Sequence, residues 1–338
     1  MNPKLENEIQ SGSMRAVRQH GPGGKLVMET VPLPVPGPGE VLIKMHASPI
    51  NFSDLSINLG DPPASHYPFT PGLEGSGTVV KAGRGLFPAL RKGKRVACTP
   101  VPGTDGTWAE YMVTGALRCT PLPGQVSSEQ GSMMLVNPMT ALAFMEMAKQ
   151  GNHKAIVNNA AASALGKMLI RLSVKYGIPL ISIVRREEQA EELRQMGARY
   201  VLNSSDPGFG EELHRLAREL GATLLLDAIA GQQTSLLLGA APQGSTVVVY
   251  GRLSREEISF EPGQLIREGK ALSGFFLGRW LQSRGLVSRI RYVNQIGRML
   301  SGTLASPVNR TMPLEQAEEA IQYYRDHMSA GKILLIPD

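Results

Sequence analysis

The chain has 338 residues, 42% of them hydrophobic and 19% charged, a composition typical of a globular protein with length for about two domains. The net charge of +6 is mild and unclustered, which suits an anionic ligand but falls short of a nucleic-acid-binding signature, so we predict no nucleic-acid partner. No run of about 18 apolar residues and no signal peptide occurs, so we predict no membrane partner and a cytoplasmic location. The only cysteines, Cys98 and Cys119, fit a reducing compartment.

The N-terminal part of the chain predicts irregular β structure. Residues 1–13 are polar and linker-like, and we interpret them as a tail or an expression remnant that precedes a native start at Met14. From there to about Gly131 the chain is rich in glycine and proline, with short β-type runs at 41–47, 77–80 and 94–98. The proline-dense segment 31–39 predicts extended chain and turns.

From Asn137 onward the pattern changes to alternating helices and strands. We expect helices at 138–149, 164–176, 187–196, 210–220 and near 235–240, and strands at 155–159, 180–184, 200–202, 224–227 and 246–250. This alternation predicts an α/β fold with a doubly wound parallel sheet. Helices at 287–301 and 314–328 and a strand at 332–336 follow. We expect this last strand to return to the first domain and cover a sheet edge there.

The segment from Ala155 to Arg186 predicts a dinucleotide site. A strand, a small-residue turn and a helix carry Ala161, Ser163 and Gly166 where the G-x-G-x-x-G pattern has glycines. Arg185 and Arg186 follow the next strand, where an acidic residue would bind a ribose hydroxyl and arginine accommodates a 2′-phosphate. We therefore predict NADPH as the cofactor. The alternative is an ordinary strand–helix–strand unit with two solvated arginines.

Five segments resemble the medium-chain dehydrogenase/reductase superfamily, in its zinc-free quinone oxidoreductase and 2-enoyl thioester reductase branch. They are Ile50–Asp54, Pro71–Gly77, Val136–Ala141, Val249–Gly251 and Ser273–Trp280. The resemblance implies a GroES-like irregular β domain at 14–136, completed by 281–338, and a Rossmann-type NADP-binding domain at 137–280. It also implies a homodimer joined through the nucleotide domains.

The resemblance also implies the cofactor contacts, residue by residue. These are Asn137, Thr140, Ala162, Ser163, Ala164, Leu165, Arg185, Arg186, Tyr250, Gly251, Arg252, Leu253, Phe275, Phe276, Leu277 and Lys332. Without the resemblance, Phe275 and Phe276 are equally consistent with core packing, and Lys332 with a solvated surface lysine.

The catalytic residues are harder to predict. Enoyl thioester reductases have a tyrosine as the proposed proton donor where this chain has Pro62, so Tyr67 is the remaining candidate. Asn51 is the candidate for polarising a substrate carbonyl, whereas we expect Asp54 to brace the following helical turn. The arginines 279, 284, 289 and 291 are candidates for binding a coenzyme phosphate or form a solvated helix face.

The sequence predicts no metal, because Asn51 and Leu73 stand where zinc-using relatives have cysteine and histidine. The leading prediction is an NADPH-dependent reductase of activated C=C bonds in enones or 2-enoyl thioesters. The alternatives are an NADPH:quinone oxidoreductase, favoured by the missing tyrosine, and a non-catalytic dinucleotide-binding sensor.

Overall fold

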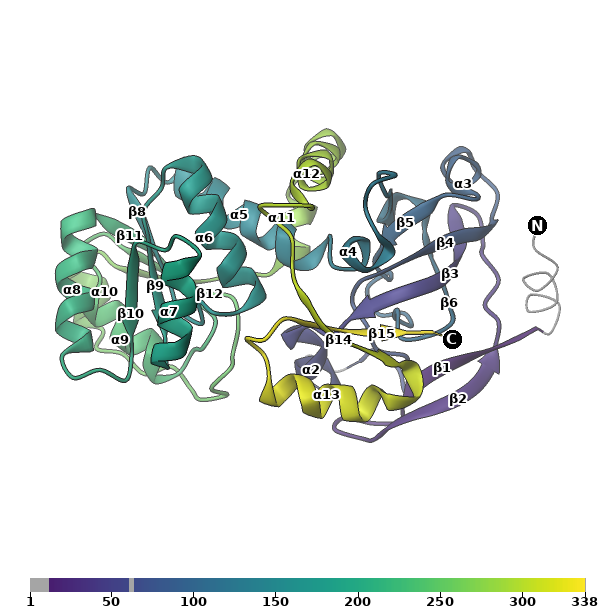
Figure 1. Cartoon of the computed structure of the whole chain (residues 1–338), viewed down its shortest axis with the longest axis horizontal. Helices are drawn as coiled ribbons and strands as arrows, with labels where there is room; N and C mark the ends of the chain where they lie inside the picture. The colour runs from purple at the N-terminus through teal and green to yellow at the C-terminus, as the bar shows by residue number, and fades with distance from the viewer. Residues whose placement is uncertain (1–11, 61–63, 338) are drawn as a thin grey trace. The chain divides into compact units, whose positions relative to one another are not determined.

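The computed structural model describes residues 12–60 and 64–337 and divides the chain into two compact units (Figure 1). Unit 1 comprises Met1–Val136 and Val293–Asp338, and unit 2 comprises Asn137–Tyr292. Residues 1–11 of the predicted tail, and Pro62, lie outside the described residues. Ser13, which we assigned to the tail, is instead the first residue of a strand and pairs with Pro32.

Unit 1 is built around one mixed sheet and a separate hairpin. Its elements up to residue 132 are β1 (Ser13–Gln19), β2 (Leu26–Pro32), β3 (Glu40–Pro49), α2 (Phe52–Asn58), β4 (Gly75–Ala82), α3 (Leu86–Arg91), β5 (Arg95–Cys98), β6 (Tyr111–Gly115), η1 (Ala116–Arg118), β7 (Cys119–Pro121) and α4 (Ser128–Ser132). The strand order is β14-β15-β3-β4-β5-β7, with β6 also paired to β3, while β1 and β2 form the hairpin. The sheet is the irregular β domain that the sequence predicted.

The C-terminal segment completes unit 1. It contains β14 (Val308–Pro313), η2 (Leu314–Gln316), α13 (Ala317–Asp326) and β15 (Lys332–Ile336). Strand β15 pairs antiparallel with β3, with Leu334 opposite Pro49, which confirms the predicted return of the last strand. The predicted helix at 314–328 is instead divided into the 3-10 turn η2 and α13, and α13 ends at Asp326.

Unit 2 is a six-stranded parallel sheet with helices on both sides (Figure 1). The elements are α5 (Val136–Gln150), β8 (Ala155–Asn158), α6 (Ala164–Tyr176), β9 (Leu180–Val184), α7 (Glu187–Gln195), β10 (Tyr200–Asn203), α8 (Phe209–Leu220), β11 (Ala222–Asp227), α9 (Gln232–Ala240), β12 (Thr246–Val249), α10 (Gly263–Glu268), β13 (Ala271–Gly274) and α11 (Leu277–Gln282). Helix α12 (Leu286–Met299) leads back to unit 1. Strand β13 and helices α10 and α11 were not among the predicted elements.

The strand order of unit 2 explains where a ligand can bind. The order β10-β9-β8-β11-β12-β13 makes the chain reverse direction across the sheet between β8 and β11. This is the order of the dinucleotide-binding fold, in which ligands bind at the carboxyl ends of the strands beside that reversal. The apolar side chains that fill one face of the sheet, such as Val157, Ile181 and Leu225, are at most 2% exposed. The site must therefore be formed by the loops that follow the strands.

Candidate active site

Small residues and one glycine, Gly166, shape the turn between β8 and α6. Ser163 is the N-cap of α6, and its Oγ accepts a hydrogen bond of 3.1 Å from the Gly166 N–H. A Cβ at Gly166 would lie 2.6 Å from the carbonyl carbon of Ala161, so only glycine lets the helix approach the strand this closely. Ala164 and Leu165 occupy the first turn of α6, where backbone N–H groups have no acceptor within the helix and can bind an anion.

Arg185 and Arg186 are both exposed directly after β9. Among the residues that the structure describes, neither guanidinium makes an ion pair or a side-chain hydrogen bond. The Ser205 hydroxyl donates a 2.9 Å hydrogen bond to the Arg185 carbonyl and so fixes the peptide that joins the two arginines. Two unpaired arginines held at a strand end can provide charge-assisted bonds to a phosphate.

A buried carboxylate holds together the loops after β8 and β11. Asp227 Oδ1 accepts bonds from Asn159 Nδ2 at 2.6 Å and from the backbone N–H groups of Ile229 and Ala230 at 2.8 and 3.0 Å. The Thr234 hydroxyl donates to its other oxygen at 2.5 Å. Because Asp227 is fully buried, these bonds compensate for its lost hydration. Asp227 thereby fixes the two loops that flank the reversal point of the sheet.

The segments after β12 and β13 meet at an aromatic cluster. Phe144 of α5 contacts Tyr250 and Phe275, with ring centroids 4.9 and 4.8 Å apart. The Tyr250 hydroxyl donates to Asn158 Oδ1 at 3.2 Å, and burial raises the pKa of Tyr250. Tyr250 therefore stays protonated, its hydroxyl is bound by Asn158 at the end of β8, and its ring packs in the aromatic cluster beside the candidate site.

The other predicted cofactor residues of unit 2 lie beside this cluster. A Cβ at Gly251 would lie 2.6 Å from the Ala228 carbonyl oxygen, and the Leu253 N–H donates to that oxygen at 3.1 Å. Phe276 is 71% exposed, which makes the alternative of core packing wrong for this residue. The remaining members, including Asn137, Thr140, Arg252 and Leu277, flank the same ends of α5, β12 and β13.

In unit 1 the structure brings Asn51 and Lys332 into direct contact. Asn51 is the N-cap of α2, and Asp54 Oδ2 accepts its backbone N–H at 2.8 Å, which is the bracing role we predicted for Asp54. The Asn51 side chain donates from Nδ2 to Glu74 Oε1 at 3.1 Å and accepts at Oδ1 from Lys332 Nζ. Glu74 Oε2 also accepts the Leu135 and Val136 N–H groups, each at 2.9 Å.

These contacts form a buried charged cluster of Asp54, Glu74 and Lys332, which are 1%, 1% and 3% exposed. The alternative of a solvated Lys332 is therefore wrong. Burial raises the pKa of Asp54 to about 7 and raises the pKa of Glu74, while hydrogen bonds and Lys332 act in the opposite direction. Burial likewise lowers the pKa of Lys332, against the attraction of both carboxylates. The cluster thus fixes the Asn51 side chain through both its Oδ1 and its Nδ2 atoms. Nδ2 carries two hydrogens and donates one of them to Glu74, so the other has no partner among the described residues.

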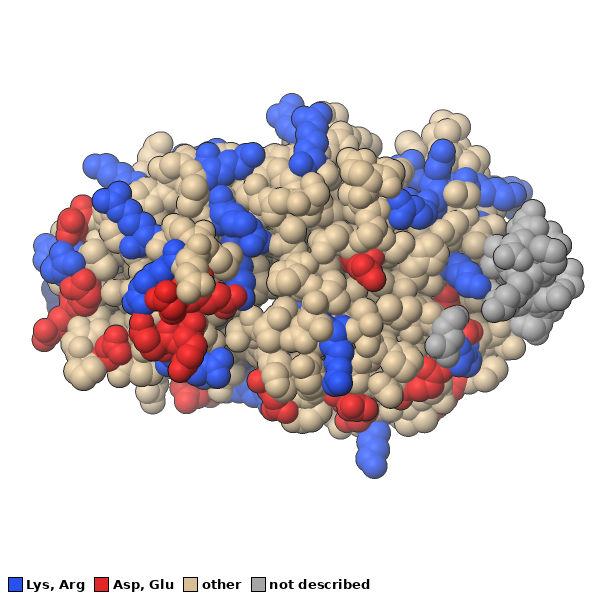
Figure 2. Space-filling model, in the orientation of Figure 1, with Lys and Arg blue, Asp and Glu red and all other residues tan. Residues whose placement is uncertain are grey.

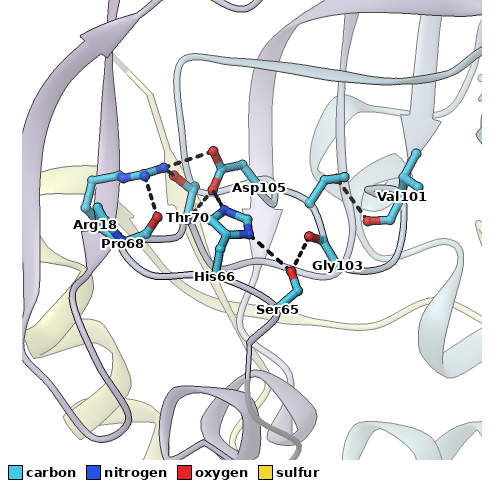
Figure 3. A network of polar contacts seen from close by, with 9 residues as sticks. Arg18, Ser65, His66, Pro68, Thr70, Val101, Gly103 and Asp105 are labelled. Atoms are coloured by element: carbon cyan, nitrogen blue, oxygen red, sulfur yellow. Dashed lines mark hydrogen bonds and ion pairs between the residues drawn. The ribbon is translucent and has the colours of Figure 1, made fainter.

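Tyr67 lies among other neighbours. Its ring packs edge-on against Phe69 at 5.5 Å, and its buried hydroxyl has no hydrogen-bond partner within residues 12–60 and 64–337. The adjacent chain is held by Arg18, which donates to the Pro68 carbonyl at 2.6 Å and to Asp105 Oδ2 at 2.9 Å (Figure 3). Asp105 also accepts the Thr70 N–H at 2.7 Å. The position of Tyr67 is therefore well defined, and its hydroxyl is buried without a partner among the described residues.

The arginines near α11 and α12 are not equivalent. Arg284 donates to Glu146 Oε1 at 3.0 Å and lies over the Trp280 ring, and Arg289 donates to the Arg284 carbonyl at 2.9 Å. Arg284 is thus an internal structural residue, whereas Arg279 and Arg291 are exposed.

Sequence reasoning missed five residues that organise the site, one of which is Asp227. Glu74 orients Asn51, Asn159 and Thr234 bind Asp227, and Asn158 binds Tyr250. One signal was present for Asp227, which directly follows a buried apolar strand and so lies at the ligand-binding edge of a parallel sheet. The sequence held no signal of its own for the role of Glu74 beside Asn51.

Comparison with known proteins places the fold in a family. Residues 37–124 match the alcohol dehydrogenase GroES-like domain, and residues 164–291 match the zinc-binding dehydrogenase domain. The chain is 28% identical to the mitochondrial enoyl-[acyl-carrier-protein] reductase of Xenopus tropicalis, over 94% of this chain and 93% of that protein. It is 26% identical to the quinone oxidoreductase of Sus scrofa, over 96% and 98%.

A solved structure is similar throughout. A provisionally named NADPH:quinone reductase from Mesorhizobium loti is 32% identical, with a TM-score of 0.90 over 96% of this chain and 99% of the other. The chain therefore belongs to the medium-chain dehydrogenase/reductase superfamily, in the branch of quinone oxidoreductases and enoyl reductases, and is an oxidoreductase of that family. This confirms the predicted fold class of a GroES-like domain and a Rossmann-type domain.

Two further observations concern metal and membrane. Within the described ranges, no three His, Cys, Asp or Glu side chains group as metal ligands would. None of the helices formed by these described residues is long and apolar enough to span a bilayer.

Proposed function

We propose that this protein is an NADPH-dependent reductase of activated C=C bonds, acting on enones or 2-enoyl thioesters. The observation that carries the proposal is the pair Arg185 and Arg186, exposed and unpaired after the second strand of a dinucleotide-binding sheet. The turn at Ala162–Leu165 fits a pyrophosphate, because Ala162, Ser163 and Ala164 are small and the turn opens onto the free N–H groups of the first turn of α6. When bound, NADPH supplies the hydride.

The protein's own residues then have separate tasks. Arg185 and Arg186 bind the 2′-phosphate, and Ala162, Ser163, Ala164 and Leu165 hold the pyrophosphate. The nicotinamide end is bound by Asn137, Thr140, Tyr250, Gly251, Arg252, Leu253, Phe275, Phe276 and Leu277, with Lys332 as a charge contact. Asn51 donates its remaining amide hydrogen to the substrate carbonyl oxygen, where negative charge develops. Tyr67 is the candidate proton donor, because its hydroxyl has no partner among the described residues.

Quinone reduction is the second candidate, and two observations favour it. Pro62 takes the place of the donor tyrosine, and a dihydroquinone takes its protons from water without a dedicated donor. The Mesorhizobium loti structure, at 32% identity, carries the name of a quinone reductase. The third candidate function is that of a non-catalytic dinucleotide-binding sensor.

One set of assays distinguishes these functions. Oxidation of NADPH is followed with an enone, a 2-enoyl thioester and a quinone as separate acceptors. Reduction of the first two supports the leading proposal, reduction of the quinone alone supports the second, and NADPH binding without oxidation leaves the sensor. Asn51→Ala should lower kcat with the enone at unchanged NADPH affinity, because Asn51 is assigned to the acceptor.

The cofactor assignment has its own test. Arg185→Glu combined with Arg186→Ala should weaken NADPH binding at least ~10-fold and leave NADH binding nearly unchanged, because it removes charge-assisted bonds to one phosphate. Lys175→Glu, an exposed charge reversal in the same unit, is the control. An equal loss for both cofactors would refute the 2′-phosphate assignment.

We further propose that the chain forms a homodimer through unit 2. Strand β13 is the last strand of its sheet, and its residues Ala271, Ser273 and Gly274 are exposed, so an edge is open to a second copy. Light scattering should give twice the chain mass, and Leu272→Pro should give the monomer mass because it disrupts this edge. A monomeric wild type would refute the proposal.

A further inference from the structure

The connection between β4 and β5 carries a cluster of exposed apolar side chains. Leu86, Phe87 and Leu90 of helix α3 are 71%, 46% and 55% exposed. Their spacing places them within about one quarter to one third of the helix circumference, at about 100° per residue, while Pro88 faces inward and is buried. Leu117, on the adjacent turn η1, is 61% exposed. We call these four residues the α3 tip.

Basic side chains lie close to the α3 tip in sequence. Six lie within fifteen residues of sequence, namely Lys81, Arg84, Arg91, Lys92, Lys94 and Arg95, and Arg118 follows Leu117. No acidic residue occurs between Glu74 and Asp105. In Figure 2 the face above α3 and β5 accordingly shows blue side chains without red ones among them. The α3 tip thus combines exposed apolar side chains with nearby charges that are all positive.

Only part of this charge is used inside the protein. Arg91 donates to the Cys119 carbonyl, and Arg95 donates to the Gly124 and Val126 carbonyls. The side chains of Arg84, Lys92 and Lys94 are exposed, and none has a partner in the described parts of the chain. These three cations are therefore free to meet an anionic surface.

We propose that the α3 tip docks this protein on the surface of an anionic phospholipid bilayer. Exposed leucine and phenylalanine side chains on a short helix can enter the boundary between headgroups and acyl chains, and a surrounding ring of Lys and Arg pairs with lipid phosphates. A bilayer is favoured over a protein partner because four side chains on α3 and η1 provide far less than the roughly 800 Å² per partner of a stable protein interface. Docking of this kind needs no spanning helix, and it is independent of the proposed reaction.

Vesicle flotation tests the proposal with the full chain. Vesicles of phosphatidylcholine alone are compared with vesicles containing about 30% phosphatidylglycerol. We expect wild type to bind the anionic vesicles at least ~10-fold more tightly than the neutral ones, and to be released when NaCl is raised from ~0.05 to ~0.5 M, since salt screens exposed charges. Absence of binding to anionic vesicles at low salt overturns the proposal, including the case in which an acidic protein binds the tip instead.

Two variants separate the apolar and charged parts. Leu86→Ser/Phe87→Ser/Leu90→Ser should weaken anionic-vesicle binding at least ~10-fold, and Arg84→Glu/Lys92→Glu/Lys94→Glu should abolish it. All six side chains are exposed, so both variants should keep the wild-type melting temperature and NADPH affinity.

Matched controls carry the same changes elsewhere. Leu286→Ser/Val287→Ser/Ile290→Ser removes three side chains of α12 that are 51%, 73% and 51% exposed. Lys25→Glu/Lys175→Glu/Arg325→Glu gives the same change of net charge at other exposed positions. Both controls should bind vesicles like wild type. Equal loss in a control and in its matching α3 variant would show that the tip is not the docking surface.

Discussion

Replacing Lys332 with methionine keeps the apolar stem and removes the ammonium that faces two buried carboxylates. In wild type, Lys332 Nζ donates to the Asn51 side chain and, at 3.4 Å, to the Ile50 carbonyl. Asp54 and Glu74 are each only 1% exposed, so water cannot replace the lost charge. Removing one partner of such a buried ionic group costs about 3–5 kcal/mol. We expect a loss of that size in the free energy of unfolding of Lys332→Met, measured where both carboxylates are ionised.

The loss should depend on pH with a defined sign. Burial raises the pKa of Asp54 from 3.8 to about 7, so between these values the folded protein holds a proton that the unfolded chain has released. Stability from this group is therefore fully present below pH 3.8 and is lost as pH rises through about 7, by roughly 4 kcal/mol. Without the ammonium of Lys332, the buried carboxylates of the variant are more stable protonated than ionised. Protonation is easier at lower pH, so Lys332→Met should lose less free energy of unfolding at about pH 6 than at about pH 8.

Urea unfolding at the two pH values measures this. Trp108 is buried in the same core cluster as Ile50 and Leu55, so its fluorescence reports on this region. Lys175→Met, at an exposed position of α6, controls for loss of a positive charge. A destabilisation below about 1 kcal/mol, or one that is equal at both pH values, would refute the argument that Lys332 compensates the buried carboxylates.

Three further outcomes follow from single contacts. Gly166→Ala should abolish NADPH binding and destabilise unit 2 by about 2 kcal/mol or more in thermal unfolding, because the added Cβ would clash with backbone atoms. The control is Gly210→Ala, which also lies in the first turn of a helix but has open space around it. This control should change stability by less than about 1 kcal/mol. Asp227→Asn should cost about 2–4 kcal/mol in urea unfolding, because the amide cannot accept all the bonds of the carboxylate, and a neutral effect would contradict its assigned role. Burial raises the pKa of Cys98 well above its usual value and that of Cys119 to about 12, so a thiol reagent at about pH 8 should label neither in the folded protein and both in urea.

The local pattern of the chain was enough to predict five of the six strands of unit 2 and the helices α5 to α9. Strand Leu180–Val184 and helix Ala164–Tyr176 have the predicted bounds, because buried parallel strands are continuous apolar runs and the N-cap serine and C-terminal glycine of α6 mark its ends. The strand predicted to reach Tyr250 ends instead at Val249, where the chain turns to place the tyrosine on the aromatic cluster. Strand β13 escaped prediction because most of it is exposed and it lacks the apolar signature of its neighbours.

The candidate catalytic residues of unit 1 were less predictable, and the reason is physical. Asn51 and Lys332 are 281 residues apart in sequence and meet only because β15 pairs with β3, next to the start of α2. Nothing in a lysine before four apolar residues distinguishes a solvated side chain from one buried against two carboxylates. That distinction depends on Glu74, which arrives from a third segment and also holds the Leu135 and Val136 N–H groups. If Asn51 polarises the substrate, its orientation depends on a long-range charge arrangement, so substitutions at Glu74 should change kcat while leaving the dinucleotide end of the site intact.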